Sequence, residues 1–227
     1  SDPVDPNQLL FSQPTIESEE IPTPELFRDL VQKQWAQPGV CPPLNDKERR
    51  FHNVAPDFSE TLELPTIDGP VAALVSATIL PNHEEDALNP GDKPSERTLR
   101  KVHKAAAMAI KTSTTASFFN RASLMWLRQM QARVSPGDLR LQQDINKVIA
   151  ATEFSADATL SASKFASRAI AHSVVARRQL WLRYWKADPN HKWKLASAPY
   201  KGVKLFGKAL EPLLVETKDG RKVLPSL

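Results

Sequence analysis

The side chains best suited to chemistry in this sequence lie towards its C-terminal end, where basic and aromatic residues alternate. Residues 164–208 contain eleven Lys or Arg side chains and a single acidic residue. Basic groups near aromatic rings suit single-stranded nucleic acid, because phosphates attract the cations and bases stack on the rings. The predicted nucleic-acid contacts are Arg177, Arg178, Lys192, Lys194, Lys201, Lys204 and Lys208. The alternative is structural: Trp181 and Trp185, at helical spacing, would close the end of a helical bundle, and the cations would complement a helix C-terminus.

One segment of this region nearly matches a phosphate-binding loop. Residues 202–209 fit the pattern GxxxxGK[ST] except that Ala209 replaces the hydroxyl residue that holds magnesium. The preceding residues do not read as a buried strand, and no parallel-sheet pattern occurs in the chain. We therefore interpret Gly202 and Gly207 as turn positions and predict no nucleotide cofactor.

Other catalytic or metal-binding patterns are weak. The five histidines are scattered, and His83-Glu84-Glu85-Asp86 reads as a solvated acidic loop rather than a cation site. No Ser/His/Asp spacing and no paired carboxylates stand out. We therefore expect no catalytic residue, no metal and no cofactor, and we do not expect an enzyme.

A long stretch with almost no helix breakers precedes these side chains and includes the first of them. Fourteen of the nineteen prolines lie in the first 94 residues, whereas residues 95–188 contain only Pro136, next to Gly137. The predicted fold is all-α, with two very long antiparallel helices at about 95–134 and 138–187 that form a coiled-coil hairpin. Ser95 is the expected N-cap of the first helix, and either Asp138 or Ser135 that of the second.

A stripe with alternating three- and four-residue spacing runs along both predicted helices and indicates a heptad-like seam. Many of its members are small, so one hairpin has a thin core. Large apolar residues such as Trp126 and Phe154 lie off the seam, which favours an assembly of at least two hairpins; the alternative is that the N-terminal helices cover them. The predicted oligomer interface comprises Leu99, Val102, Ile110, Leu124, Leu127, Ile145, Ile149, Leu160, Ile170, Val174 and Trp181.

The hairpin is the third of four predicted parts. Residues 1–23 form an acidic, Pro-rich extended arm, 24–94 a small helical and irregular region, 95–188 the oligomerising hairpin and 189–227 a basic aromatic segment. In the second part, helices are expected from Pro24 with Thr23 as N-cap, at 46–51, and at 70–78 with Asp68 as N-cap. Residues 52–66 read as irregular.

The charge of the chain is strongly polarised. Residues 1–100 carry 18 acidic and 8 basic side chains, and the remainder carries 8 acidic and 22 basic ones. The basic end could bind RNA or DNA, or the acidic end of another copy. The single cysteine, Cys41, favours a reducing intracellular setting, nuclear or cytoplasmic. No apolar run is long enough for a transmembrane helix and the N-terminus does not resemble a signal peptide, so no membrane partner is expected.

The C-terminal residues also resemble a known family. Residues 176–185, Ala-Arg-Arg-Gln-Leu-Trp-Leu-Arg-Tyr-Trp, are followed by Lys194-Leu195, Pro199, Gly202 and Leu205-Phe206-Gly207. This composite resembles the C-terminal domain of lamina-associated polypeptide two alpha, and also the Gag-like proteins of DIRS-type, tyrosine-recombinase retrotransposons. The resemblance extends upstream more faintly and implies an elongated, all-helical antiparallel coiled-coil dimer. In the lamina-associated family this region binds A-type lamins and retinoblastoma protein.

The sequence therefore leaves three functions open. The main prediction is a self-associating Gag- or capsid-like structural protein of a retroelement or of a gene derived from one. The first alternative is a nuclear scaffold or chromatin adaptor that displays binding surfaces for a nuclear protein on the same dimer. The second is a nucleic-acid-packaging protein.

Overall fold

A computed structural model of the chain describes residues 20–75 and 84–227. The chain divides into two compact units, Ser1–Pro43 and Leu44–Leu227. The arm predicted at 1–23 lies outside the described residues except for its last four positions. The predicted boundaries after residues 23, 94 and 188 stay a prediction.

The described part of the first unit is one helix and a turn. Helix α2 spans Glu25–Ala36, with Pro24 at its N-cap, so Thr23 is not the cap that the sequence suggested. A 3-10 turn, η1, follows at Pro38–Val40. One side of α2 carries exposed apolar side chains at helical spacing: Leu26, Phe27, Leu30, Val31 and Trp35.

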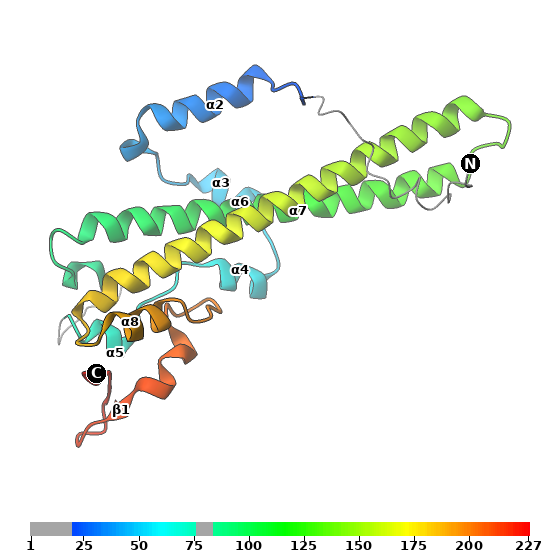
Figure 1. Ribbon diagram of the computed structural model, residues 1–227. Helices are drawn as coiled ribbons and strands as arrows, with labels where there is room; N and C mark the ends of the chain where they lie inside the picture. Colours follow the sequence, from blue (N-terminus) through cyan, green and yellow to red (C-terminus); the bar gives the residue numbers. More distant parts are fainter. Residues whose placement is uncertain (1–19, 76–83) are drawn as a thin grey trace, which may run out of the picture. The chain divides into compact units, whose positions relative to one another are not determined.

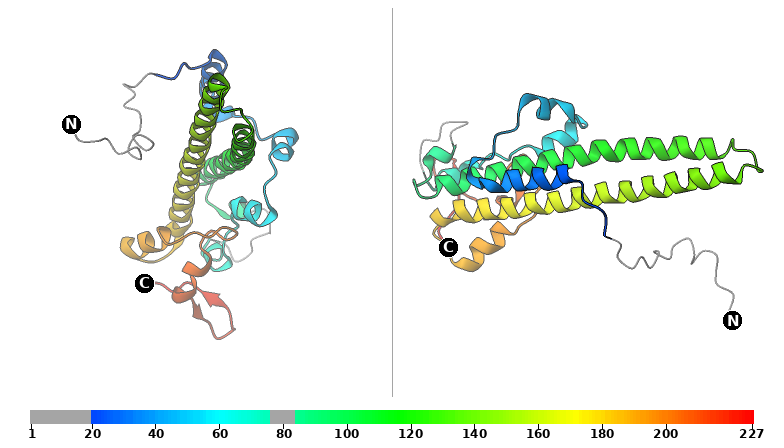
Figure 2. Two further views of the ribbon diagram at one scale, coloured as in Figure 1. Left: turned by 90° about the vertical axis from the view of Figure 1, so that its right-hand side faces the viewer. Right: turned by 90° about the horizontal axis from the view of Figure 1, so that it is seen from above.

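Two long helices dominate the second unit and confirm the predicted fold class. Helix α6 spans Lys93–Gln131 and helix α7 spans Leu139–Trp181. They lie side by side and run in opposite directions (Figures 1 and 2). The break between them is the predicted Pro136-Gly137 turn, and the Asp138 side chain caps α7 by accepting a hydrogen bond from the Leu141 N–H at 3.1 Å.

The ends of the hairpin differ from the prediction. Helix α6 begins before Pro94, because proline is tolerated in the first turn, where its missing N–H has no helical partner; Ser95 is therefore not the N-cap. Helix α7 ends at Trp181, six residues earlier than predicted, and continues as the 3-10 turn η3 at Leu182–Tyr184. The chain bends there because Trp181, Leu182 and Trp185 all turn into the core.

Short helices precede the hairpin in the second unit. Helix α3, Asp46–Phe51, matches the predicted bounds and is closed by a capping box between Asn45 and Glu48. Helix α4, Pro56–Leu62, replaces the irregular chain that the sequence suggested, with Pro56 at its first position. Helix α5, Gly69–Ala72, starts after Asp68, but the Asp68 side chain does not cap it. A 3-10 turn, η2, spans Glu84–Ala87.

The C-terminal segment folds back on the end of the hairpin. It contains helix α8 (Pro189–Ala196), the 3-10 turns η4 (Gly207–Ala209) and η5 (Glu211–Leu213), and an antiparallel pair of strands, β1 (Val215–Glu216) and β2 (Lys222–Val223). A parallel bridge between Thr66 and Lys204 joins this segment to the chain after α4. None of the helices in the described residues is long and apolar enough to span a membrane.

The hydrophobic core lies at the end of the hairpin where the C-terminal segment packs. Its largest members are Trp181, Trp185 and Phe206, which α4, α5 and the first half of α6 help to enclose. Between residues 111 and 165, by contrast, Ile145 is the only buried residue. The two halves of the hairpin are therefore physically different. One packs into the core, and the other, between residues 111 and 165, is a pair of helices with almost no buried residues, which we call the bare half.

Candidate functional site

The predicted seam lies between α6 and α7 of a single chain. Five of its eleven members are buried there, namely Ile110, Ile145, Ile170, Val174 and Trp181. Four are half-buried, namely Leu99, Leu124, Leu127 and Ile149. The remaining two, Val102 and Leu160, are exposed. The buried members hold the hairpin together, and a role for this set between chains stays a prediction.

Polar pairs fix the register in the bare half of the hairpin. The Asn120 amide donates to Ser155 Oγ at 3.2 Å, and the Gln131 amide donates to Asn146 Oδ1 at 2.6 Å. These pairs connect side chains of opposite helices across a seam that otherwise contains mostly small residues. They set alignment and bury little apolar area, so they leave this half of the hairpin weakly cored.

Large apolar side chains project from both helices of this half. Phe119 and Trp126 on α6 are 60% and 62% exposed, and Phe154 and Phe165 on α7 are each 63% exposed. We call the following exposed set the distal apolar residues: Phe118, Phe119, Met125, Trp126, Phe154, Leu160 and Phe165. Isolated exposed apolar residues are ordinary on protein surfaces, whereas such a concentration on one half of a hairpin indicates an interaction site.

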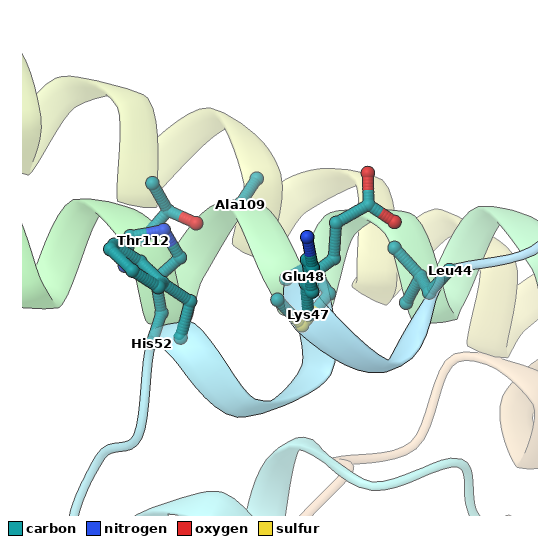
Figure 3. Close-up of a pocket in the computed structure, with 8 residues that line it drawn as sticks. Leu44, Lys47, Glu48, His52, Ala109 and Thr112 are labelled. Carbon is teal, nitrogen blue, oxygen red and sulfur yellow. The ribbon is translucent and has the colours of Figure 1, made fainter.

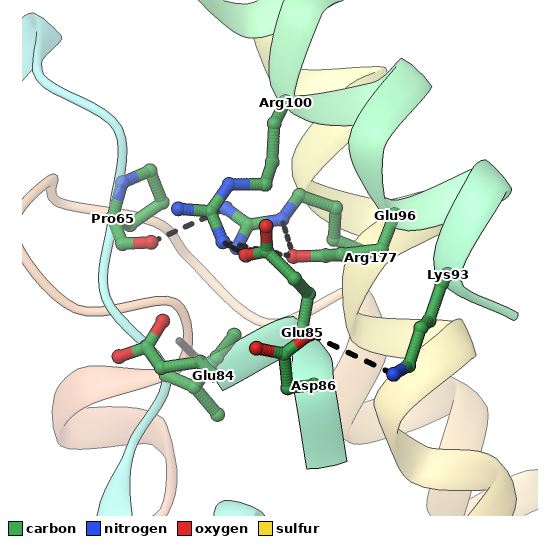
Figure 4. Close-up of polar contacts among 9 residues, drawn as sticks. Pro65, Glu84, Glu85, Asp86, Lys93, Glu96, Arg100 and Arg177 are labelled. Carbon is green, nitrogen blue, oxygen red and sulfur yellow. Dashed lines mark hydrogen bonds and ion pairs between the residues drawn. The ribbon is translucent and has the colours of Figure 1, made fainter. Parts of the chain in front are cut away.

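At the other end of the hairpin, Arg177 forms a buried ion pair with Glu96 (Figure 4). Its Nε and one terminal nitrogen donate to Glu96 Oε1 at 3.0 and 2.8 Å, and its other terminal nitrogen donates to the carbonyl of Pro65 at 3.2 Å. Both side chains are fully buried. The sequence placed Arg177 on a nucleic-acid surface, and the structure corrects this, because the guanidinium is enclosed and already satisfied.

Arg178 is corrected in the same way and has a different internal role. Its guanidinium donates to four backbone carbonyls: those of Leu205 at 2.7 Å, Ala196 at 3.1 Å, Pro199 at 3.2 Å, and Ala198. It also lies over the Phe206 ring. Burial lowers the pKa of Arg178, and the nearby carboxylate of Asp68 opposes that shift. A single side chain thus holds the end of α8 and both ends of the loop that follows.

Asp68, from the N-terminal part of the chain, binds the same loop as Arg178. We call these two side chains the clasp. The Asp68 carboxylate accepts hydrogen bonds from the backbone N–H groups of Phe206 at 2.8 Å and Gly207 at 3.0 Å. This explains why Asp68 does not cap α5. Thr66 adds two backbone hydrogen bonds, to the carbonyl of Val203 at 3.0 Å and from the N–H of Leu205 at 2.9 Å.

The five predicted lysines, unlike the two arginines, lie on the surface. Lys194, Lys201, Lys204 and Lys208 are exposed, and Lys192 is half-buried. Gly202 and Gly207 have φ angles of 86° and 57° and are turn positions, as predicted. Gly207 begins the three-residue 3-10 turn η4 rather than an α-helix, so the segment has no phosphate-binding helix N-terminus.

The acidic residues near α6 have structural partners. Glu85 pairs with Arg100 at 2.6 Å, Asp86 with Lys93 at 3.6 Å, and Glu84 accepts the N–H of Ile67 at 3.2 Å (Figure 4). His83 lies outside the described residues. Within residues 20–75 and 84–227, no group of three or more His, Cys, Asp or Glu side chains is arranged to hold a metal ion.

A shallow groove of about 380 Å³ lies between α3 and α6 (Figure 3). Its lining is mainly apolar and contains no paired carboxylates or thiol. The lining residues are Leu44, Lys47, Glu48, Phe51, His52, Met108, Ala109 and Thr112.

His103 should make stability pH-dependent. It is fully buried, its Nε2 donates to the carbonyl of Leu62 at 3.1 Å, and its Nδ1 has no partner among the described residues. Burial, and then the charge of Arg177, lower its pKa below the ordinary 6.5. The unfolded chain therefore binds the proton more tightly, so stability is complete above pH 6.5 and falls as the pH drops through the folded pKa.

Urea unfolding at a series of pH values measures this effect. His103→Gln is expected to flatten the pH dependence below pH 6.5, since the residue that titrates is gone. Exposed His172 provides the matched control, and His172→Gln is expected to retain the wild-type slope. Equal slopes in wild type and His103→Gln would contradict the assignment.

The turn at Gly202 and Val203 yields a second stability prediction. A Cβ on Gly202 would lie 3.0 Å from the Thr61 carbonyl oxygen at a φ of 86°, so Gly202→Ala should destabilise the fold by about 1–3 kcal/mol.

Val203 is β-branched yet has a φ of 62°, and Val203→Gly should relieve strain and stabilise the fold by up to about 1 kcal/mol. Thermal unfolding of both variants checks the opposite signs, and a destabilised Val203→Gly would show that the valine side chain contributes more than its strain costs.

Sequence reasoning missed the buried polar group of Glu96, His103 and Arg177. A signal for it exists, because Glu96, His103 and buried Ile110 are spaced by seven residues and Arg177 lies on the apolar stripe of α7. A polar residue that such a stripe buries needs an internal partner. No comparable signal identifies Asp68, whose partners lie 138 and 139 residues away.

The chain is similar to one group of known proteins. The sequence model of the family described as Lamina-associated polypeptide 2 alpha matches residues 15–222. Human lamina-associated polypeptide 2, isoform alpha, is 25% identical over 210 residues, covering 91% of this chain and 28% of that protein. Mouse lamina-associated polypeptide 2, isoforms alpha/zeta, is 25% identical over 190 residues, covering 82% of this chain and 27% of that protein. The chain thus spans little more than a quarter of these relatives, and no solved structure matches it.

Proposed function

The chain belongs to the lamina-associated polypeptide 2 alpha family, and we propose that it is a nuclear scaffold adaptor that self-associates through the bare half of its helical hairpin. Of the functions that the sequence left open, family membership favours this adaptor over the retroelement Gag protein. The relatives named above are lamina-associated proteins, and none of them is a retrotransposon protein. The Gag-like origin stays a prediction without support.

The observation that carries self-association is the exposure of the distal apolar residues. Aromatic side chains bury roughly 150–250 Å² each when covered, and transfer from water contributes about 25 cal/mol per Å². The five exposed aromatics of this set, with their aliphatic neighbours, supply area approaching the ~800 Å² per partner of a standard stable interface. A second hairpin is the proposed partner, because it presents the same surface and the two would satisfy each other by a two-fold axis.

The proposed second partner is a protein of the nuclear lamina. The support is that the relatives are lamina-associated proteins. The chain spans only 28% and 27% of their lengths, so this partner is proposed for the chain. The assembled hairpin would act as a rigid platform, and the proposal assigns the chain no catalytic step. Nuclear location follows from the same argument and is part of the proposal.

Light scattering over a range of protein and salt concentrations tests the proposal. A fixed dimer or tetramer that also retains purified A-type lamin in a pull-down supports the adaptor. Mass that grows into particles would replace the adaptor by the capsid-like function. A monomer at all concentrations would contradict self-association through the distal apolar residues.

A further inference from the structure

The segment that Arg178 holds together carries an uninterrupted excess of positive charge. Residues 189–210 contain five lysines and one histidine but no acidic residue. None of these lysines forms an ion pair with a carboxylate in the described part of the chain. Like charges held close together without counter-charges repel one another, and an anionic partner would relieve that repulsion.

We propose that α8 and the loop Tyr200–Lys204 form a binding surface for single-stranded nucleic acid. Lys194, Lys201 and Lys204 contact the phosphates, and Trp193 stacks on a base. This surface is separate from the hairpin half that carries the proposed self-association, so the two functions can coexist in one assembly.

The buried clasp brings these lysines together. The carbonyls of Ala196, Pro199 and Leu205 all accept hydrogen bonds from the Arg178 guanidinium, at 2.7–3.2 Å. Lys194 is two residues before the first of these carbonyls, and Lys201 is two residues after the second. Lys204 directly precedes the third, so all three lysines originate within a few residues of one buried side chain.

The loop is also held rigid before any ligand binds. Thr66 pairs with the backbone on both sides of Lys204, at 3.0 and 2.9 Å. Val203, between Gly202 and Lys204, is 50% exposed and keeps a left-handed φ of 62° that strains a β-branched residue. Strained backbone persists where the surrounding structure enforces it and is concentrated at binding sites. Rigid presentation lowers the entropic cost of binding.

Trp193 distinguishes this surface from a simple basic patch. Of the three tryptophans in the C-terminal half of the unit, Trp181 and Trp185 are buried in the core. Trp193, in contrast, is 56% exposed on α8 between Lys192 and Lys194. An exposed ring on a basic segment provides a stacking platform, which needs an unpaired base. Duplex nucleic acid keeps its bases stacked, and an acidic peptide has none, so single strands are the favoured ligand.

The test uses the whole chain and a fluorescein-labelled oligothymidylate of about 16 nucleotides, followed by anisotropy. Lys194→Gln/Lys201→Gln/Lys204→Gln should weaken binding and reduce the slope of log K against log salt by about 2, since each phosphate contact contributes roughly 0.7 for single strands. Trp193→Ala should lose about 5- to 150-fold in affinity, the range for one stacked base. Oligothymidylate should quench tryptophan fluorescence in wild type and much less in Trp193→Phe.

The matched control removes the same charge elsewhere. Lys101, Lys104 and Lys164 are exposed on the long helices, and their triple change to Gln should leave affinity and salt slope close to wild type. Equal losses in the two triple variants would overturn the proposal in favour of general electrostatic attraction. Wild-type affinity in Trp193→Ala, or equal binding of duplex or heparin, would also overturn it and would indicate an acidic partner such as another copy's N-terminal segment.

Discussion

Replacing Arg178 by alanine is expected to lower the free energy of unfolding by about 3–6 kcal/mol, the largest effect of any single substitution considered. The guanidinium satisfies four backbone carbonyls and is almost fully buried. Alanine removes all four donors and leaves a cavity, and each unpaired buried acceptor costs roughly 1–3 kcal/mol unless water replaces the donor. This loss of stability comes from the fold itself, so it is measured without any ligand.

Urea unfolding followed by tryptophan fluorescence measures this loss, because Trp181 and Trp185 report on the core around the clasp. Arg178→Lys should recover only part of the stability, since one ammonium cannot span carbonyls that three guanidinium nitrogens reach. Exposed Lys194→Ala is the matched control and should change stability by less than about 0.5 kcal/mol. A variant Arg178→Ala within about 1 kcal/mol of wild type would show that water or neighbouring groups satisfy the carbonyls instead.

The double variant Phe119→Ser/Trp126→Ser is expected to weaken self-association by at least about 30-fold per residue, the effect of losing an interface side chain worth 2 kcal/mol or more. Both side chains are mostly exposed in the single chain, so neither contributes much to its own fold. The midpoint of the mass against concentration curve in light scattering should therefore shift upwards, while the helical circular dichroism of the dissociated chain stays that of wild type.

Trp193→Ser provides the control for this pair. It removes another exposed aromatic side chain, from α8 rather than from the hairpin, and should leave the association curve unchanged. If the double variant associates as wild type does, the distal apolar residues are not the interface. If Trp193→Ser weakens association equally, the interface includes the C-terminal segment and the proposed separation of the two surfaces is wrong.

Features specified by local sequence could be predicted. Helix α3 matches its predicted bounds, because Asn45 and Glu48 cap each other over three residues. The hairpin turn at Pro136-Gly137 is likewise confirmed, and of the two expected caps, Asp138 and Ser135, the structure shows Asp138. Both features depend on contacts within a few residues. Helix α4 was missed because Pro56 reads as a breaker, although proline is also a favourable first residue of a helix.

The candidate site could be predicted only in part. The basic and aromatic composition of residues 189–210 is visible in the sequence, and so is the excess of large apolar residues off the hairpin seam. The assignment of Arg177 and Arg178 to a nucleic-acid surface was wrong, because charge alone does not distinguish a solvated cation from a buried one. Burial depends on partners such as Glu96, which is 81 residues away, and Pro65, which is 112 residues away.

The sequence by itself determined that this chain forms a long helical hairpin with a polarised charge, because periodicity, proline placement and capping act over one or two helical turns. Only the tertiary structure decided which half of the hairpin is cored and which is bare. It also decided that two arginines organise the interior while the lysines beside them stay in solvent. The physical reason is that a charged side chain is buried only where residues distant in sequence supply its hydrogen-bond partners. Asp68, Thr66 and Pro65 are such partners, and they contact the C-terminal part of the chain only in the folded structure.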